Sequence, residues 1–154
     1  MFDDTAPKGM LTYWKTAYLR ALDDGAIDTV IDQASRMRSP MSAVHIHHVE
    51  GAVNRVSAEA TAFGHRDAPF ILNIVGMWPN AEENGQNVAW TREFARVVEP
   101  FSSGAAYVNF LGDEGEARVK AAYGDAKYAR LAALKKTYDP KNLFRLNQNI
   151  RPSV

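Results

Sequence analysis

Cysteine is absent from this 154-residue chain, so disulfide bonds and thiolate chemistry are excluded. Long hydrophobic runs are absent as well, since no apolar stretch approaches the roughly 20 residues that a membrane-spanning helix needs. Neither sign of charge is in excess, because 18 Lys and Arg balance 18 Asp and Glu, and the basic residues form no stripe typical of a nucleic-acid surface. These absences favour a globular enzyme or ligand-binding domain.

Motifs that bind phosphates are missing too. Neither the dinucleotide fingerprint GxGxxG nor the phosphate loop GxxxxGK[ST] occurs, so we expect no phosphate cradle in this chain. The nucleophile motif GxSxG is also absent. The acidic residues 1–5 lack the basic and apolar regions of a signal peptide, which predicts a cytoplasmic protein.

The pattern of apolar residues predicts one α+β domain. We expect strands over residues 11–19, 41–49, 70–77 and 105–110, and helices over 24–38, 80–98, 114–123 and 125–138. The first helix carries one apolar stripe, formed by Ile27, Val30, Ile31, Ala34 and Met37. Because the second and third strands follow each other without a helix, an antiparallel sheet with helices packed on one face is favoured. Residues 1–112 would form this layer, and residues 113–154 would add helices and an irregular tail.

Tyr107 is the first candidate for chemistry. On the strand expected over 105–110, Tyr107 and Asn109 would point to one face, while Val108 and Phe110 would point to the other. A tyrosine on the polar face could reach a cleft, although a phenol with its ordinary pKa of about 10 needs a proton partner to act as a base. The alternative is a half-buried sheet aromatic without a chemical role.

Two histidines form the second candidate. His45 and His47 are two residues apart on a predicted strand, so they share a face and could bind a metal with Glu50 nearby. A closed site needs about four ligands, and too few others are available, so we predict no metal site. His45 and His47 are better suited to lining a cleft as hydrogen-bonding groups. His48 falls on the apolar face, where a core histidine is expected.

The C-terminal stretch YDPKNLFRLNQNI, residues 138–150, resembles the signature that ends the berberine bridge enzyme-like family of FAD-linked oxidases. Family members are about three times longer and bind FAD with their N-terminal half. The resemblance therefore implies that this chain is the C-terminal portion only, with residues 113–154 as the berberine-like helices and tail. It also implies the same fold, an antiparallel sheet whose second face covers the flavin.

The resemblance assigns roles to particular residues. In the family a tyrosine in Y-x-N, about forty residues before the tail asparagines, faces the substrate and acts as a base, which corresponds to Tyr107. Asn147 and Asn149 would lie near the flavin, and Asn109 would contact the substrate. From their place on the cleft-facing strand, His45 and His47 are expected to contact the substrate as well. Without the surrounding pattern, the amides at 147–149 would be only a polar terminus. Glu50-Gly51-Ala52 departs from the family's Gly-Gly-Ala, so Glu50 is either a substrate contact or a solvated loop residue.

Three functions follow as expectations. The leading one is the C-terminal domain of an FAD-dependent oxidoreductase that oxidises a hydroxyl- or amine-bearing sugar or secondary metabolite, with hydride passing to the flavin. FAD would be bound mainly by a domain outside this chain. The alternatives are a flavin-free module that binds a small ligand or catalyses a non-redox step, and an inert fragment. Trp14 and Tyr18 would leave the uncovered sheet face sticky, which predicts a homodimer or an FAD-domain partner chain.

Overall fold

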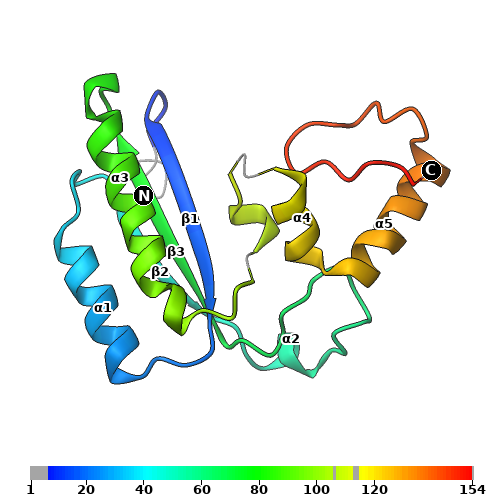
Figure 1. The fold of residues 1–154 in the computed structure, drawn as a ribbon, viewed down its shortest axis with the longest axis horizontal. Helices are drawn as coiled ribbons and strands as arrows, with labels where there is room; N and C mark the ends of the chain where they lie inside the picture. Colours follow the sequence, from blue (N-terminus) through cyan, green and yellow to red (C-terminus); the bar gives the residue numbers. More distant parts are fainter. Residues whose placement is uncertain (1–6, 106, 113–114, 154) are drawn as a thin grey trace.

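The computed structural model describes residues 7–105, 107–112 and 115–153. Its strands lie beside one another behind α1 and α3, and the C-terminal helices form a separate flank (Figure 1). In chain order the elements are β1 (Leu11–Leu19), α1 (Asp24–Ser35), β2 (Ala43–His48), α2 (Ala52–Arg55), β3 (Phe70–Trp78), η2 (Ala81–Glu83), α3 (Asn84–Val98), η3 (Glu99–Phe101), η4 (Val108–Phe110), α4 (Glu116–Tyr123) and α5 (Asp125–Tyr138).

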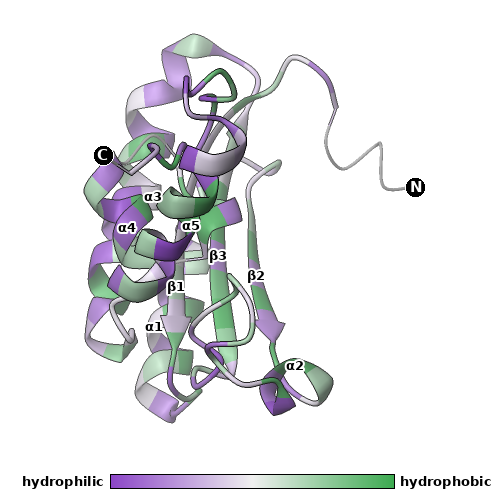
Figure 2. Cartoon of the chain, turned by 90° about the vertical axis from the view of Figure 1, so that its right-hand side faces the viewer, coloured by the Kyte–Doolittle hydropathy of each residue, from purple (hydrophilic) through white to green (hydrophobic). Residues whose placement is uncertain are grey.

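The sheet is antiparallel, as the sequence predicts. Its strand order is β1-β3-β2, so β3 is central and pairs with β1 from Leu11↔Trp78 onward and with β2 from Ala43↔Val75 onward. All of β3 beyond its first residue is buried, and the strand is mostly green in the hydropathy view (Figure 2). A central strand covered on both sides explains its nearly continuous apolar sequence.

Helices α1 and α3 cover one face of the sheet, which confirms the predicted layer. The core between the helices and the sheet is formed by β1, β3 and α3, and its residues Leu19, Leu72, Ile74 and Phe94 are completely buried. The Nε1 of Trp90 on α3 donates to the carbonyl oxygen of Gln33 on α1 over 2.9 Å, which joins the two helices. We call these two helices and three strands the sheet layer.

Local signals decide where the helices begin and end. The side chain of Asp23 accepts from the backbone N–H of Ala26 at 2.8 Å and so caps α1, but this helix ends at Ser35, earlier than expected. At the start of α3 the short turn η2 intervenes, and the amide of Asn80 donates to Glu83 instead of capping the helix. Glu99-Pro100 follows the end of α3, as predicted.

Residues 115–153, which we call the C-terminal part, contain α4, α5 and an irregular tail, as predicted. Gly124 joins the two helices with a φ of 79°, a left-handed conformation that glycine adopts without strain. Asp139 ends α5 and holds the tail: its carboxylate pairs with Lys135 at 2.6 Å and accepts from the N–H groups of Leu143 and Phe144. The beginning of the tail is thus ordered by polar contacts around one buried carboxylate.

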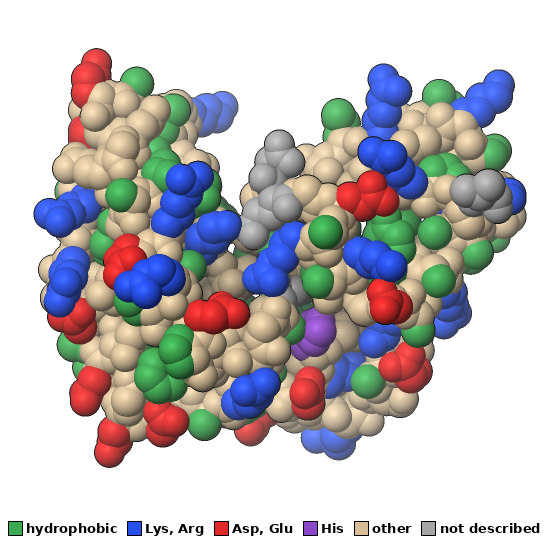
Figure 3. Space-filling model, viewed as in Figure 1, with side chains coloured by type: hydrophobic (Ala, Val, Ile, Leu, Met, Phe, Trp, Pro, Cys, Tyr) green, Lys and Arg blue, Asp and Glu red, His purple; other side chains and the backbone are tan. Residues whose placement is uncertain are grey.

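The surface agrees with the balanced charge of the sequence. On the face seen in the space-filling view, basic and acidic side chains are interspersed, and a hollow separates the sheet layer from the C-terminal part at the top (Figure 3). In the described part of the chain, none of the helices is long and apolar enough to cross a membrane.

Candidate functional site

The candidate site lies on the sheet face that α1 and α3 do not cover, which we call the open face. Strand alternation sends Trp14, Thr16 and Tyr18 of β1 to this face, while their neighbours Ala17 and Leu19 enter the core. The register places Thr16 beside Asn73 of β3, and Asn73 beside His45 of β2. A row of polar side chains therefore crosses the middle of the sheet.

On the open face, the buried donor Nε1 of Trp14 and the buried acceptor Oδ1 of Asn73 have no hydrogen-bond partner among the residues that the structure describes. Thr16 follows Trp14 by two residues on β1 and pairs with Asn73 on β3. Its hydroxyl donates to the carbonyl oxygen of Leu72 and so does not satisfy either atom. An unsatisfied buried polar group costs about 1–3 kcal/mol, and such groups in native structures call for a ligand, water or functional reason. A donor and an acceptor on one side of a sheet suit a ligand that offers both kinds of group.

Tyr107 and Asn109 do come together, but not on a strand. The expected strand over 105–110 is wrong: residues Val108–Phe110 form the turn η4, and Ala106 lies outside the described residues. After Ser102 and Ser103 bond to the end of β1, Gly104 adopts a φ of 77° and turns the chain out of the sheet. The turn brings the Nδ2 of Asn109 within 2.9 Å of the phenol oxygen of Tyr107, to which it donates.

Phe110 does not point to the opposite side from Tyr107, as the strand would require. Its ring meets that of Tyr107 edge-on at 5.0 Å and also lies 6.1 Å from the ring of Trp14 and 5.6 Å from that of His47. The segment 107–112 thus folds over the open face, with Phe110 between β1 and β2. Tyr107 also packs against the buried cluster that contains Tyr18 and Ile71.

Tyr18 is almost completely buried, so the expectation that it makes the open face sticky is wrong. Burial raises the pKa of Tyr18 above the ordinary range of a phenol, and the nearby Tyr107 and Asp67 raise it further. Burial likewise raises the pKa of Tyr123, with a second contribution from Tyr107. An ordinary phenol is already protonated at neutral pH, so both phenols near Tyr107 stay neutral.

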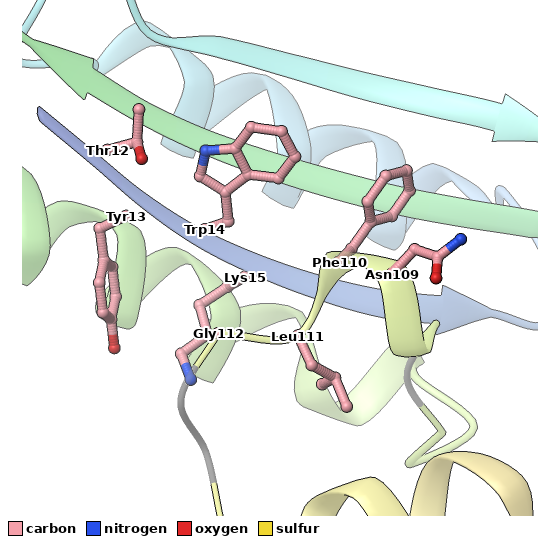
Figure 4. Close-up of a pocket in the computed structure, with 8 residues that line it drawn as sticks. All are labelled: Thr12, Tyr13, Trp14, Lys15, Asn109, Phe110, Leu111 and Gly112. Carbon is pink, nitrogen blue, oxygen red and sulfur yellow. The ribbon is translucent and has the colours of Figure 1, made fainter. Parts of the chain in front are cut away.

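Cavities lie on both sides of Phe110. The first, of about 390 Å³, lies along β1 and is shown in Figure 4, where Trp14 and Phe110 lie on one side of the strand and Tyr13 and Lys15 on the other. The second, of about 440 Å³, is mostly apolar and is lined by His47, Val49, Val53, Phe63, Arg66, Ile71, Tyr107 and Phe110. Phe110 therefore lines both cavities, and Tyr107 lines the second. In the second cavity a ligand could contact the aromatic ring of Phe110 and the polar phenol of Tyr107.

His45 and His47 lie where the sequence places them, exposed on the open face with their rings 6.1 Å apart. His48 is also exposed, instead of being a core residue: it stacks on Phe70 and lies 3.2 Å from the carboxylate of Glu50. Among the described residues, His, Cys, Asp and Glu side chains form no group of three or more that could hold a metal ion.

The tail reaches the site through Gln148, a residue to which the sequence analysis gave no separate role. Its amide donates to the carbonyl oxygens of Leu111 and Gly112, at 2.7 and 3.1 Å, and so fixes the tail on the segment after η4. Asn147 and Asn109 together line a third cavity, which is also of about 440 Å³. Asn149 has a buried Oδ1 without a partner. The only sequence signal for Gln148 was its position between the two asparagines.

Comparison with known proteins identifies related sequences. Residues 106–151 match the family model described as "Berberine and berberine like". The FAD-linked oxidoreductase YvdP of Bacillus subtilis is 36% identical over 103 residues, which cover 67% of this chain and 23% of that protein. The FAD-linked oxidoreductase YgaK of the same bacterium is 31% identical over 133 residues, 86% of this chain and 29% of its own length.

Solved structures show the same fold. A glycopeptide hexose oxidase complexed with teicoplanin is 27% identical, with a TM-score of 0.78 over 94% of this chain and 33% of its own. BBE-like 1 from Physcomitrella patens gives the same TM-score at 25% identity, over 93% of this chain and 31% of its own. The chain thus spans no more than about a third of these proteins. It belongs to the berberine bridge enzyme-like family of FAD-linked oxidases and contains the part that the family model describes as berberine-like.

Proposed function

We propose that the chain supplies the substrate side of an FAD-dependent oxidoreductase that oxidises a hydroxyl- or amine-bearing sugar or secondary metabolite. The observation that carries the proposal is the phenol of Tyr107, which accepts from Asn109 at the open face and lines the mostly apolar cavity beside Phe110. A sugar substrate is supported by the hexose oxidase among the structural neighbours.

FAD fits the open face only in part. A flat ring system with hydrogen-bond donors and acceptors along its edge matches the unpartnered Trp14 Nε1 and Asn73 Oδ1, and the amides of Asn147 and Asn149 could reach it from the tail. The sequence offers no phosphate cradle, so the rest of the cofactor would be held outside this chain. When bound, the flavin would supply the hydride acceptor.

The residues of this chain would orient the substrate and move its proton. Oxidation of an alcohol removes a hydride from carbon and a proton from oxygen, and Tyr107 would receive that proton as its phenolate, after releasing its own proton to solvent. The N–H of Asn109 can stay bonded to the phenol oxygen whether or not this oxygen carries a proton. Tyr18 and Tyr123, which stay protonated, would keep the surroundings neutral, and Phe110 would exclude water from the reacting groups.

Titration with FAD gives the first test. The isolated chain should bind FAD weakly or not at all, because it lacks a phosphate-binding loop. Quenching of the flavin fluorescence on addition of the protein measures the affinity. Stoichiometric binding at micromolar concentration or tighter would contradict the proposal that another part of the enzyme holds the cofactor.

The variant Tyr107→Phe gives the decisive test. It requires a completed enzyme, which we define as the glycopeptide hexose oxidase with its matching third replaced by this chain. Flavin reduction by substrate, followed by stopped-flow absorbance, should slow by about 10²–10⁴ when the base is lost. Stability should change by about 1 kcal/mol or less, because the ring still packs against Phe110.

Tyr138→Phe is the matched control, since Tyr138 is 82% exposed at the end of α5 and should leave the rate unchanged. If Tyr107→Phe also leaves the rate unchanged, Tyr107 is only an aromatic packed on the sheet. The base would then have to be sought at His45 or His47, or outside this chain.

A further inference from the structure

Tyr107 lines a fourth cavity in addition to the mostly apolar one beside Phe110. This fourth cavity has a volume of about 190 Å³ and is the more polar of the two, and we call it the tyrosine cavity. The polar residues that line it are Tyr18, His65, Tyr107, Asn109 and Tyr123. Because Phe110 lines the apolar cavity and not the tyrosine cavity, Tyr107 borders two spaces, one suited to a substrate and one that the proposed oxidation does not yet use.

The phenol proton of Tyr107 is available to the tyrosine cavity. The Nδ2 of Asn109 donates to the phenol oxygen at 2.9 Å, and this bond uses a lone pair of the oxygen and not its proton. Within residues 7–105, 107–112 and 115–153, no group accepts the phenol proton. The asparagine therefore holds the phenol in place while leaving its proton free to be donated elsewhere.

His65 presents a basic nitrogen in the same region. Its Nε2 lies 3.0 Å from the carbonyl oxygen of Ala122 on α4. A carbonyl oxygen only accepts, so Nε2 carries a proton, and Nδ1 of the neutral ring keeps its lone pair. The ring also packs against that of Tyr18, with the ring centres 5.3 Å apart. His65 is thus a base that is held in one tautomer at the wall of the tyrosine cavity.

The backbone of His65 has a conformation that is uncommon for a residue with a side chain. Its φ is 54°, in the left-handed region, and the turn is closed by a hydrogen bond from the N–H of Ala68 to the carbonyl oxygen of His65. Such conformations are concentrated at functional sites. The side chain is half-buried, so the ring lines the cavity and is also accessible to solvent.

The tyrosine cavity has the size and the polar groups that water needs. A water molecule occupies about 30 Å³ in the liquid and requires two to four polar partners, so the cavity can hold several. Burial raises the pKa values of Tyr18 and Tyr123, and Tyr107 raises both further. Their hydroxyls can therefore bind water without taking up a proton. Of the described residues that line the cavity, only His65 has a side chain that accepts a proton near neutral pH.

We propose that water in the tyrosine cavity carries the phenol proton of Tyr107 to Nδ1 of His65, which then releases a proton to solvent. The inference rests on the oxidation proposed above and supplies the route by which Tyr107 becomes a phenolate. Imidazole is a much stronger base than water, so it receives the proton faster than water alone would.

The protons balance over one turnover. The O–H bond of Tyr107 breaks and an N–H bond forms at Nδ1 of His65. The hydroxyl proton of the substrate then restores the O–H bond of Tyr107, while the hydride passes to the flavin. His65 returns to its neutral form by giving its added proton to solvent. One proton thus leaves through His65 for each hydride that is transferred.

His65→Gln in the completed enzyme tests the relay. Glutamine keeps an N–H group that can bond to the carbonyl oxygen of Ala122, but it cannot accept a proton. Flavin reduction should slow by at least about tenfold. The dissociation constant of the substrate should stay the same, because His65 does not line the apolar cavity. His48→Gln, the same change at an exposed histidine that does not line the tyrosine cavity, should leave the rate unchanged. An unchanged rate in His65→Gln would overturn the relay.

His65→Gly separates proton transfer from packing. Glycine adopts a positive φ without strain, and loss of the ring leaves space for a small molecule. Imidazole, added at concentrations that raise the melting temperature of the isolated variant, should increase the rate of flavin reduction at least about tenfold. Pyrazole, a ring of the same size and a far weaker base, should not. Rescue by both rings or by neither would show that His65 acts only through packing, and would overturn the relay.

The isolated chain provides a measurement without flavin. Nuclear Overhauser effects from water to the ring protons of Tyr107 and Tyr123 should show that water occupies the cavity, and their absence would overturn the relay. The two proposals can fail separately. If Tyr107→Phe leaves flavin reduction unchanged, the assignment of Tyr107 as the base fails. If Tyr107→Phe slows it and His65→Gln does not, only the relay fails.

Discussion

In the sheet layer, large apolar side chains such as Leu72 and Phe94 are completely buried, whereas in the C-terminal part Leu143, Phe144 and Leu146 are mostly exposed. The first region is held by a continuous apolar core. In the second, the tail after α5 is held by the carboxylate of Asp139 and the amide of Gln148, which fix the backbone but leave Leu143, Phe144 and Leu146 uncovered. The comparison teaches that order and burial are separate here: the tail has a defined path without a core of its own.

Truncating one phenylalanine in each region should give the largest contrast. Phe94→Ala removes a fully buried ring and should lower the free energy of unfolding by about 3–5 kcal/mol. Phe144→Ala removes a ring that is 83% exposed and should change it by less than about 0.5 kcal/mol. Urea denaturation followed by circular dichroism measures both. Similar losses for the two variants would show that the tail is packed as tightly as the sheet layer.

Close packing within the sheet layer should appear at Gly76. A Cβ at this position would lie 2.8 Å from the hydroxyl oxygen of Thr91 and 3.1 Å from the carbonyl oxygen of Tyr13, so β3 and α3 would have to move apart. We expect Gly76→Ala to destabilise the chain by about 1–3 kcal/mol.

Gly85, in the first turn of α3, is the matched control for Gly76. No atom lies within 4 Å of a Cβ built there, so Gly85→Ala should stabilise the chain by up to about 1 kcal/mol. Thermal melting of the two variants gives the sign of each effect. A stabilising Gly76→Ala would mean that the contact between β3 and α3 is loose.

Loss of the Asp139 carboxylate should release the tail with little effect on the sheet layer. The hydrogen bond from Lys135 lowers the pKa of Asp139, and the N–H groups of Leu143 and Phe144 lower it further. Because the pKa of Asp139 is lower in the folded state, its ionised carboxylate stabilises the folded state. This stabilisation is complete above the ordinary Asp pKa of about 3.9 and is lost as the pH falls through the pKa of the folded state.

Hydrogen exchange measures this release directly. In Asp139→Asn the N–H groups of Leu143 and Phe144 should exchange faster at neutral pH, while the amides of β3 stay protected. Lys135→Met, which removes the cation but keeps the carboxylate, should give a smaller increase. If β3 loses protection as well, the two regions unfold together and the comparison between them fails.

Periodicity was sufficient to predict the sheet layer, because each strand and helix there has one buried side. It could not show how much of a stripe is covered: Val30 of α1 packs on the core, while Ile31 of the same stripe is exposed. The strand expected over 105–110 failed for a tertiary reason, since Gly104 turns the chain away from β1 after Ser103. Local propensity contains no information on that turn.

The candidate site was predictable where residues are close in sequence. Tyr107 and Asn109 share a side in a strand and are also neighbours in the turn that the structure shows, so their association survives the wrong secondary structure. His45 and His47 follow directly from strand alternation. The unpartnered Oδ1 of Asn73 and the anchoring role of Gln148 depend on which segments meet in space, and the family resemblance alone drew attention to the tail.

The three tryptophans give this chain an optical asymmetry. Trp14 faces the open side of the sheet, Trp78 donates to Asn84 at the start of α3, and Trp90 bonds to α1, so all three belong to the sheet layer and its immediate surroundings. Their emission will therefore report melting of that layer, while release of the tail is followed separately by hydrogen exchange at Leu143 and Phe144. A cysteine introduced for a fluorophore on the tail would be the sole thiol in the molecule, so energy transfer from the tryptophans could follow the tail's separation in solution.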